Sequence, residues 1–320
     1  MGHVKAWVGG NDYKYFQYDH VFKGKRQVGS TFKPFLYGAV LDIPGVTVCE
    51  EVLNQPVTVE MPDGSVWSPN NSDYSIGGLV TIKKALANSM NSVSARLIKE
   101  KVNPTLVADF AYKAGIESKL DEVYSLALGT TDLSVLEMTK AYSTIANLGT
   151  RIEPIFVTRI EDKSGTILAQ FQPDMIESID PNTAYELLNL MQGVVDQGTA
   201  VRLRYKYKFK NEIAGKTGTT QNQSDGWFMG ITPDLVTGVW VGHQDRRVHF
   251  SSIKYGQGAN MSLPIWAEYM QRVYRDQEIK LPQDPFRKPA GFGEDLICRS
   301  KKVEEAKPDE GPSPDDLEGF

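Results

Sequence analysis

Three short segments in the last third of the sequence constrain the fold most strongly, because they follow one another with little chain between them. They read "EIAGKTGTT", "GWFMGITP" and "LVTGVWVGH", and together they span residues 212–243. Each contains the β-branched and aromatic residues that strands favour, and each is bounded by turn-forming residues. They predict three successive strands, which we expect to form an antiparallel sheet because short connections join antiparallel neighbours.

Helical patterns fill most of the sequence between residues 79 and 149. "TIKKALANSMNSVSARLIKE" carries apolar residues at helical spacing, and "PTLVADFAYKAG" and "TDLSVLEMTKAYSTIANLG" each end in a glycine suited to a helix C-cap. Helices are also expected at 32–41, 181–198 and 263–276. The prediction is an α/β fold of the α+β type: an antiparallel sheet flanked by helices, with a mainly helical subdomain at about 79–149.

The other segments are less regular. Residues 4–8 suit a short strand, and residues 53–78 suit a loop-dominated excursion. Residues 155–171 predict a hairpin that turns at Lys163-Ser164-Gly165. The segment "RLRYKYKFK" (202–210) alternates cations with apolar residues, and a half-exposed strand is favoured there over a cationic rim for an anionic polymer or lipid headgroups.

Charge is concentrated at the end of the chain. The net charge of the 320 residues is −5, and residues 301–320 hold seven acidic and three basic residues, so the rest is nearly neutral. Because nucleic-acid-binding proteins usually carry a basic surplus, no nucleic-acid partner is expected. We predict one domain over residues 1–275 and a Pro-rich, acidic, disordered tail over 276–320.

Neither an anchor nor a metal site is predicted. No apolar run approaches the roughly 18 to 20 residues of a bilayer span, and the N-terminus lacks the layout of a signal peptide. The histidines form no metal-ligand pattern, and no cofactor is expected. Cys49 and Cys298 fit no metal or redox spacing, and two unpaired thiols are favoured over a disulfide, which an oxidising compartment would permit.

A serine and a lysine stand at S-x-x-K spacing in "RQVGSTFKPFLYGAV". On a helix this spacing brings Ser30 and Lys33 together, so a lysine of lowered pKa could take the serine proton. Pro34 is tolerated only in a first helical turn, which puts Ser30 at the helix start, where an oxyanion is favoured. Ser251 and Lys254 match the same spacing, but they lie in a polar segment that predicts a loop.

Two more short motifs carry chemistry. Ser89 and Asn91 form S-x-N within the helical block and could relay a proton and hold a substrate amide, although ordinary helix capping is an equal alternative. The same pattern at Ser68-Pro69-Asn70 predicts a structural loop.

The third motif is K-T-G, at Lys216, Thr217 and Gly218 on the first predicted strand. Lys216 and Thr217 could hold a carboxylate, Gly218 would let a substrate backbone approach, and the N–H of Thr219 could line an oxyanion hole. Asp225, close behind this strand, could orient the following loop.

S-x-x-K, S-x-N and K-T-G in this order are the signature of penicillin-binding proteins and serine β-lactamases. Over roughly residues 4–275 the chain resembles the transpeptidase domain of class A penicillin-binding proteins. The resemblance extends to "AWVGG", "RQVGSTFKPFLYG", "WSPNN", "KKALANSMNSVSARL", "SLALGTTDLSVLEMTKAYSTIANLG", "DQGTA", "AGKTGTT", "DGWFMGITP" and "VWVGH".

The resemblance implies the penicillin-binding transpeptidase fold and a role for each motif. Ser30 would be the acylated nucleophile and Lys33 its base, with the N–H groups of Ser30 and Thr219 as the oxyanion hole. Ser89 would pass the proton to the leaving group. Asn91 would bind the donor peptide, and Lys216, Thr217 and Gly218 would receive its terminal carboxylate and backbone.

The implied reaction is cross-linking of peptidoglycan stem peptides. The serine would attack a D-Ala–D-Ala bond and release D-alanine, an amine of a second peptide would resolve the acyl-enzyme, and β-lactams would acylate the same serine. Family members are extracytoplasmic, with a membrane anchor and a glycosyltransferase domain that we expect this chain to lack. A D,D-carboxypeptidase, a β-lactamase or a non-catalytic β-lactam sensor would use the same serine and remain alternatives.

Overall fold

The computed structural model describes residues 2–60 and 64–298. A central sheet in the order β11-β12-β13 is formed by Ala214–Thr219, Asp225–Ile231 and Val236–Gly242. The three strands are antiparallel, with Lys216 opposite Met229 and Trp227 opposite Trp240. The predicted strands and their direction are confirmed.

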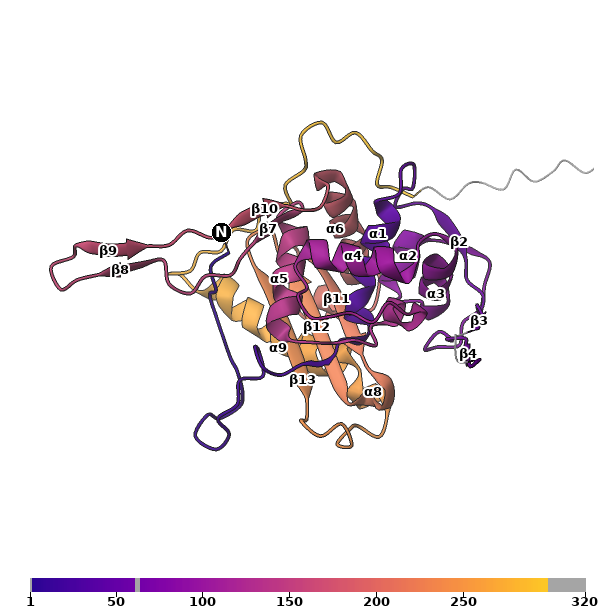
Figure 1. Ribbon diagram of the computed structural model, residues 1–320, viewed down its shortest axis with the longest axis horizontal. Coiled ribbons are helices and arrows are strands. Elements are labelled where there is room, and N and C mark those ends of the chain that lie inside the picture. Colours follow the sequence, from indigo (N-terminus) through magenta and orange to yellow (C-terminus); the bar gives the residue numbers. More distant parts are fainter. Residues whose placement is uncertain (1, 61–63, 299–320) are drawn as a thin grey trace, which may run out of the picture.

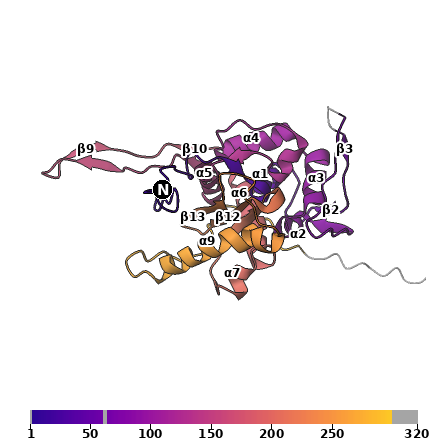
Figure 2. The same ribbon diagram turned by 90° about the horizontal axis from the view of Figure 1, so that it is seen from below.

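Helices cover both faces of this sheet (Figures 1 and 2). One face packs against α9 (Gly258–Arg275), because Gly226 and Gly230 leave room for Met261 and Trp266. The other face packs against α5 (Val135–Ala146) and α6 (Pro181–Asp196). The α+β architecture expected from the sequence is therefore confirmed.

Beyond α5 and α6 lies a helical layer centred on α1 (Lys33–Leu41), whose residues are all buried. A helix that is apolar on every side is stable only when other helices surround it. Its neighbours include α2 (Ile82–Ala87), α3 (Asn91–Glu100) and α4 (Pro104–Ala114). With the 3-10 helix η2 (Tyr124–Leu128) they make residues 79–149 mainly helical, as predicted.

The remaining strands form two-stranded ribbons. The predicted hairpin consists of β8 (Arg159–Glu161) and β9 (Ile167–Gln170), and it projects far from the body of the domain (Figure 1). The other pairs are β1 (Arg26–Gln27) with β6 (Asp132–Leu133), β2 (Glu51–Leu53) with β5 (Leu79–Thr81), β3 (Val59–Glu60) with β4 (Val66–Trp67), and β7 (Thr150–Ile152) with β10 (Met175–Glu177).

Two predicted strands are wrong. Residues 4–8 form no strand, and the only bridge in this region joins His3 to Ile155 within the described residues. Residues 202–210 begin with the short helix α7 (Arg202–Tyr205) and then turn. The alternation there is overridden by Arg204, which donates to the Asp196 carboxylate and to the carbonyls of Phe209 and Asn211, and so closes the segment on itself.

The two cysteines are joined, which corrects the prediction of unpaired thiols. Cys49 and Cys298 form a disulfide although 249 positions separate them. Residues 276–298, which were expected to be disordered, run along the domain without regular structure, with Phe286 buried among core residues. The other part of the predicted disordered tail, residues 299–320, lies outside the described residues. Within the described ranges, no helix is both long and apolar enough to cross a membrane.

Candidate active site

Ser30 lies in a tight turn just before α1. The turn is the 3-10 helix η1 (Gly29–Phe32), and the Lys33 N–H that opens α1 donates to the carbonyl of Ser30. Pro34 occupies the first turn of α1, as its rigid φ requires. The predicted position of Ser30 at a helix start is therefore confirmed.

Neighbouring backbone fixes this turn. Gly29 has a φ of 53° and donates its N–H to the carbonyl of Gly129 over 3.0 Å. Position 129 requires glycine for two reasons: its φ is 75°, and a Cβ there would lie 1.9 Å from the Gly29 oxygen. On the other side, the hydroxyl of Tyr142 donates to the carbonyl of Thr31 over 2.7 Å. Ser30 is thus held between two anchored residues.

Lys33 is fully buried, and its amine has fixed partners. Nζ donates to the Ser89 carbonyl and to Asn91 Oδ1, both at 2.7 Å, and lies 3.3 Å from Ser89 Oγ. Burial, helped by the nearby Lys216 cation, holds the pKa of Lys33 well below its usual range. When Lys33 is neutral, its amine has two N–H donors and one lone pair, and donors placed on the two short contacts leave the lone pair free to accept a proton.

Ser89 and Asn91 lie where α2 ends and α3 begins. Ser89 adopts a left-handed backbone with φ 56°, and Asn91 is the first residue of α3. Neither side chain caps the helix, because the Asn71 carboxamide oxygen accepts the backbone N–H of Asn91 at 2.7 Å and that of Ser92 at 3.1 Å. The capping alternative is therefore wrong, and both side chains are available to the cluster around Lys33.

Lys216 reaches the same cluster from β11. Its side chain is fully buried, and Nζ donates to Ser89 Oγ at 2.9 Å and to the carbonyl of Thr217 at 3.0 Å. Burial lowers the pKa of Lys216 to about 7. The Thr217 hydroxyl lies 2.7 Å from the hydroxyl of Thr199, a residue missed as a site candidate although it belongs to the quoted "DQGTA".

The end of β11 passes directly against the turn that carries Ser30. A Cβ at Gly218 would lie 2.7 Å from the Val28 carbonyl, and one at Gly29 would lie 2.7 Å from the Thr219 carbonyl. Thr219 accepts the N–H of Gly258 on its hydroxyl at 3.0 Å. The three motifs, from distant parts of the chain, therefore meet at one place.

Asp225 connects the sheet to the strand that leads to Ser30. Its carboxylate accepts the Arg26 Nε–H at 2.7 Å, the Ser224 hydroxyl at 2.7 Å and the Trp240 indole N–H at 3.0 Å. Burial alone would raise the pKa of Asp225, but these hydrogen bonds and the Arg26 charge together hold it below its usual range. Asp225 thus ties β12 to β1, four residues before the serine.

The repeated motifs lie apart from this cluster. Ser251 is exposed, and Lys254 belongs to the short helix α8 (Ile253–Gly256) rather than to a loop. Ser68-Pro69-Asn70 lies in an irregular segment, as predicted, and its Asn70 carbonyl accepts the Asn91 carboxamide. Residues 163–165 form the tip of the projecting hairpin.

Comparison with known proteins gives a consistent result. Residues 1–259 match the model of the penicillin binding protein transpeptidase domain. The chain is 36% identical over 287 residues to penicillin-binding protein 1A of Aquifex aeolicus, covering 88% of this chain and 38% of the relative. It is 35% identical over 293 residues to penicillin-binding protein 1A of Neisseria meningitidis, covering 88% and 36%. The chain thus spans less than half the length of these relatives.

Two solved structures share the fold. Penicillin-binding protein 1A from Haemophilus influenzae superposes with a TM-score of 0.81 at 25% identity, over 88% of this chain and 47% of that one. PonA1 from Mycobacterium tuberculosis, in complex with penicillin V, superposes with a TM-score of 0.73 at 26% identity, over 88% and 76%.

Proposed function

Because this chain belongs to the penicillin-binding protein transpeptidase family, we propose that it is a peptidoglycan D,D-transpeptidase that works through an acyl-serine intermediate. The observation that carries this proposal is the Lys33 amine. It is buried, its two N–H donors are taken by the Ser89 carbonyl and Asn91, and it lies one turn from Ser30. This is the arrangement that a lysine needs to act as a base.

In the first half-reaction Ser30 Oγ attacks the carbonyl carbon of the penultimate D-alanine. The serine proton passes to Lys33 Nζ, and the carbonyl becomes an oxyanion between the backbone N–H groups of Ser30 and Thr219. Collapse breaks the peptide bond, and the proton moves through Ser89, which contacts both lysines, to the amine of the departing D-alanine. An amine of a second stem peptide then attacks the ester carbon, the bond to Ser30 Oγ breaks, and the proton that the amine loses returns to Ser30 Oγ, which leaves the cross-link as a new peptide bond.

The donor peptide would lie along β11. This is an edge strand, so an extended peptide can align beside it. Lys216 and Thr217 would hold the terminal carboxylate, with the Thr217 hydroxyl oriented by Thr199. Gly218 keeps the strand free of a side chain at the closest approach, and Asn91 would bind the donor backbone. β-Lactams would acylate Ser30 in the same way as the peptide.

The biological setting follows from the relatives. We propose that residues 1–275 make up the transpeptidase domain and that it acts on the extracytoplasmic side of the membrane, where peptidoglycan is cross-linked. The disulfide between Cys49 and Cys298 supports this location, because such bonds persist in oxidising compartments.

A donor stem peptide and an amine acceptor test the proposal. The protein should release D-alanine and form the cross-linked dimer, and Ser30→Ala should form neither product. Release of D-alanine with water as the only acceptor would indicate a carboxypeptidase instead. A penicillin adduct that hydrolyses within seconds would indicate a β-lactamase, and a stable adduct without peptide turnover would indicate a sensor.

A further inference from the structure

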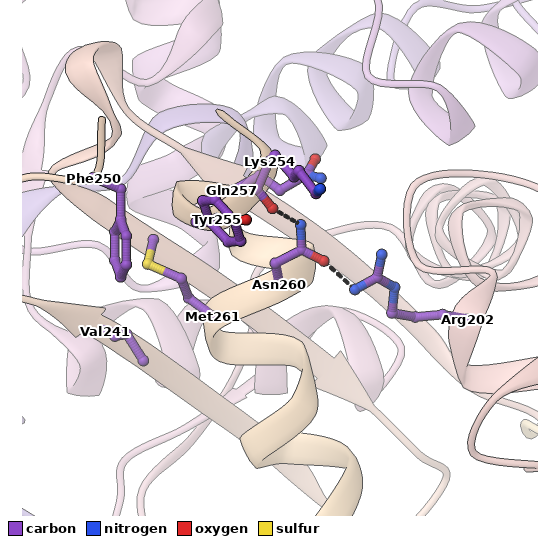
Figure 3. A pocket seen from close by; sticks show the side chains of 8 residues that line it. All are labelled: Arg202, Val241, Phe250, Lys254, Tyr255, Gln257, Asn260 and Met261. Carbon is purple, nitrogen blue, oxygen red and sulfur yellow. Dashed lines mark hydrogen bonds between the residues drawn. The ribbon is translucent and has the colours of Figure 1, made fainter. Parts of the chain in front are cut away.

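A cavity of about 720 Å³ lies beside the end of β11, formed by α7, α8, the start of α9 and β13 (Figure 3). Its lining is divided. Phe250, Met261 and Val241 lie on one side, and the polar residues lie on the other (Figure 3). The lining residues are Arg202, Val241, Phe250, Lys254, Tyr255, Gln257, Asn260 and Met261.

Two cations of this cavity lack an acidic neighbour. No carboxylate lies within ion-pair distance of Arg202 or Lys254 in the described part of the chain. Asn260 contacts both residues in different ways: its carboxamide accepts from Arg202 Nη1 and donates to the backbone carbonyl of Lys254, as Figure 3 shows. Arg202 Nη1 also donates to the Ala259 carbonyl at 2.8 Å. The Arg202 charge is therefore anchored to α9, whereas the exposed Lys254 side chain carries its ammonium group 5.5 Å from the centre of the Tyr255 ring.

The cavity is directly connected to the strand that would bind the donor. The Gly258 N–H, next to Gln257 in the cavity wall, donates to Thr219 Oγ1 at 3.0 Å. Thr199, three residues before the lining residue Arg202, contacts Thr217. Chain segments next to two lining residues, Gln257 and Arg202, therefore contact β11 at positions assigned to the substrate.

Strand direction decides which part of a substrate would reach this cavity. The proposed function places the terminal carboxylate at Lys216 and Thr217 and the scissile carbonyl at Thr219. An extended peptide advances about 3.3 Å per residue. The residue before the acylating D-alanine therefore lies beyond Thr219, on the side where Gly258 and α8 begin the cavity.

We propose that this cavity is the subsite for the side chain of the residue before the acylating D-alanine, which is the third residue of the stem peptide. We propose further that the cavity selects a side chain with an aliphatic stem ending in a carboxylate. The inference rests on the proposed function and adds the substrate class. The apolar side of the cavity would contact the stem, and Lys254 and Arg202 would bind the carboxylate. A side chain ending in an ammonium group alone would meet like charge.

Two donor peptides that differ only in the third residue test the selection. Diaminopimelate and lysine are matched probes, since they differ by one terminal carboxylate. We expect kcat/KM for D-alanine release to favour the diaminopimelate peptide by about tenfold, the effect of one charge-assisted hydrogen bond. Lys254→Gln should remove most of this preference, and Lys254→Glu should reverse it. Lys163→Gln, at the exposed hairpin tip, is the control and should keep the preference.

Binding of the same peptides to Ser30→Ala, measured by calorimetry, reports the selection without the chemistry. Tighter binding of the diaminopimelate peptide that is lost in Ser30→Ala/Lys254→Gln supports the subsite. Equal binding of the two peptides, or a preference unchanged by Lys254→Gln, overturns it. Failure of the proposed function gives a different result: the parent protein would bind peptide selectively but release no D-alanine and form no penicillin adduct.

Discussion

Replacing Asp225 with alanine should leave the buried Arg26 cation without its carboxylate partner, close to the turn that carries Ser30. The Arg26 side chain is 10% exposed and that of Asp225 is fully buried, and the Arg26 Nη2 atom already lacks a partner. Without the carboxylate, Arg26 keeps its hydrogen bond to the Gln244 carbonyl and its contact with the Trp240 ring, neither of which carries a negative charge. The Trp240 indole N–H loses this acceptor, and the Ser224 hydroxyl keeps Thr220 Oγ1 as a partner.

The expected cost follows from these contacts. Removing one partner of a buried ion pair costs about 3 to 5 kcal/mol. With an unfolding entropy of about 2.1 cal/mol/K per residue, about 4 kcal/mol lowers the Tm of a chain of this length by about 6 °C. Thermal unfolding followed by circular dichroism measures this change. Well below the Tm, acylation of Ser30 by penicillin should also slow several-fold, because β1 leads directly into η1.

Two further variants make the test specific. The double variant Arg26→Met/Asp225→Ala has no buried charge without a partner. Its loss of unfolding free energy should therefore be about 2 kcal/mol smaller than the summed losses of Arg26→Met and Asp225→Ala. Lys101→Ala removes an exposed ion pair with Glu50 of similar length, 2.6 Å, and should cost at most about 1 kcal/mol. Strictly additive effects, or an equal cost for Lys101→Ala and Asp225→Ala, would refute the reasoning.

Three other predictions concern the lysines and the disulfide. Lys33→Met should keep its circular dichroism spectrum but lose about 10² to 10⁴-fold in the rate of penicillin acylation, and an unchanged rate would exclude Lys33 as the base. Since the pKa of Lys216 is about 7, its ammonium is lost as the pH rises through 7, and kcat/KM for a donor that ends in a carboxylate should fall. Lys216→Arg, which stays charged, should remove this fall at alkaline pH. A fall that persists in Lys216→Arg would contradict binding of the carboxylate by Lys216. Reduction of Cys49–Cys298 should lower the unfolding free energy by about 2 to 5 kcal/mol in denaturant titrations, and an unchanged midpoint would contradict a stabilising disulfide.

Local patterns predicted the elements that carry the site. The apolar run behind Lys33, the proline at the first turn and the strand of Lys216 each depend on neighbours in sequence, and the structure has them as expected. That Lys33, Ser89, Asn91 and Lys216 contact one another came from the resemblance, because no spacing rule joins residues more than fifty positions apart.

What the sequence did not reveal depends on tertiary contacts. Cys49 and Cys298 pair across 249 positions, with the intervening chain bringing their Cα atoms to 5.2 Å. Asn71 and Thr199 orient the site through single side chains in irregular segments, where no periodicity marks them. The alternation at 202–210 predicted a strand, but the hydrogen bonds of Arg204 outweigh that local preference.

The central claim is that Ser30, and not the second serine at S-x-x-K spacing, forms the covalent intermediate. Intact-mass spectrometry and peptide mapping after treatment with penicillin test it most directly. One adduct per chain is expected, on the peptide that contains Ser30, absent from Ser30→Ala and unchanged in Ser251→Ala. An adduct that survives Ser30→Ala, or one that maps to Ser251, would contradict the account.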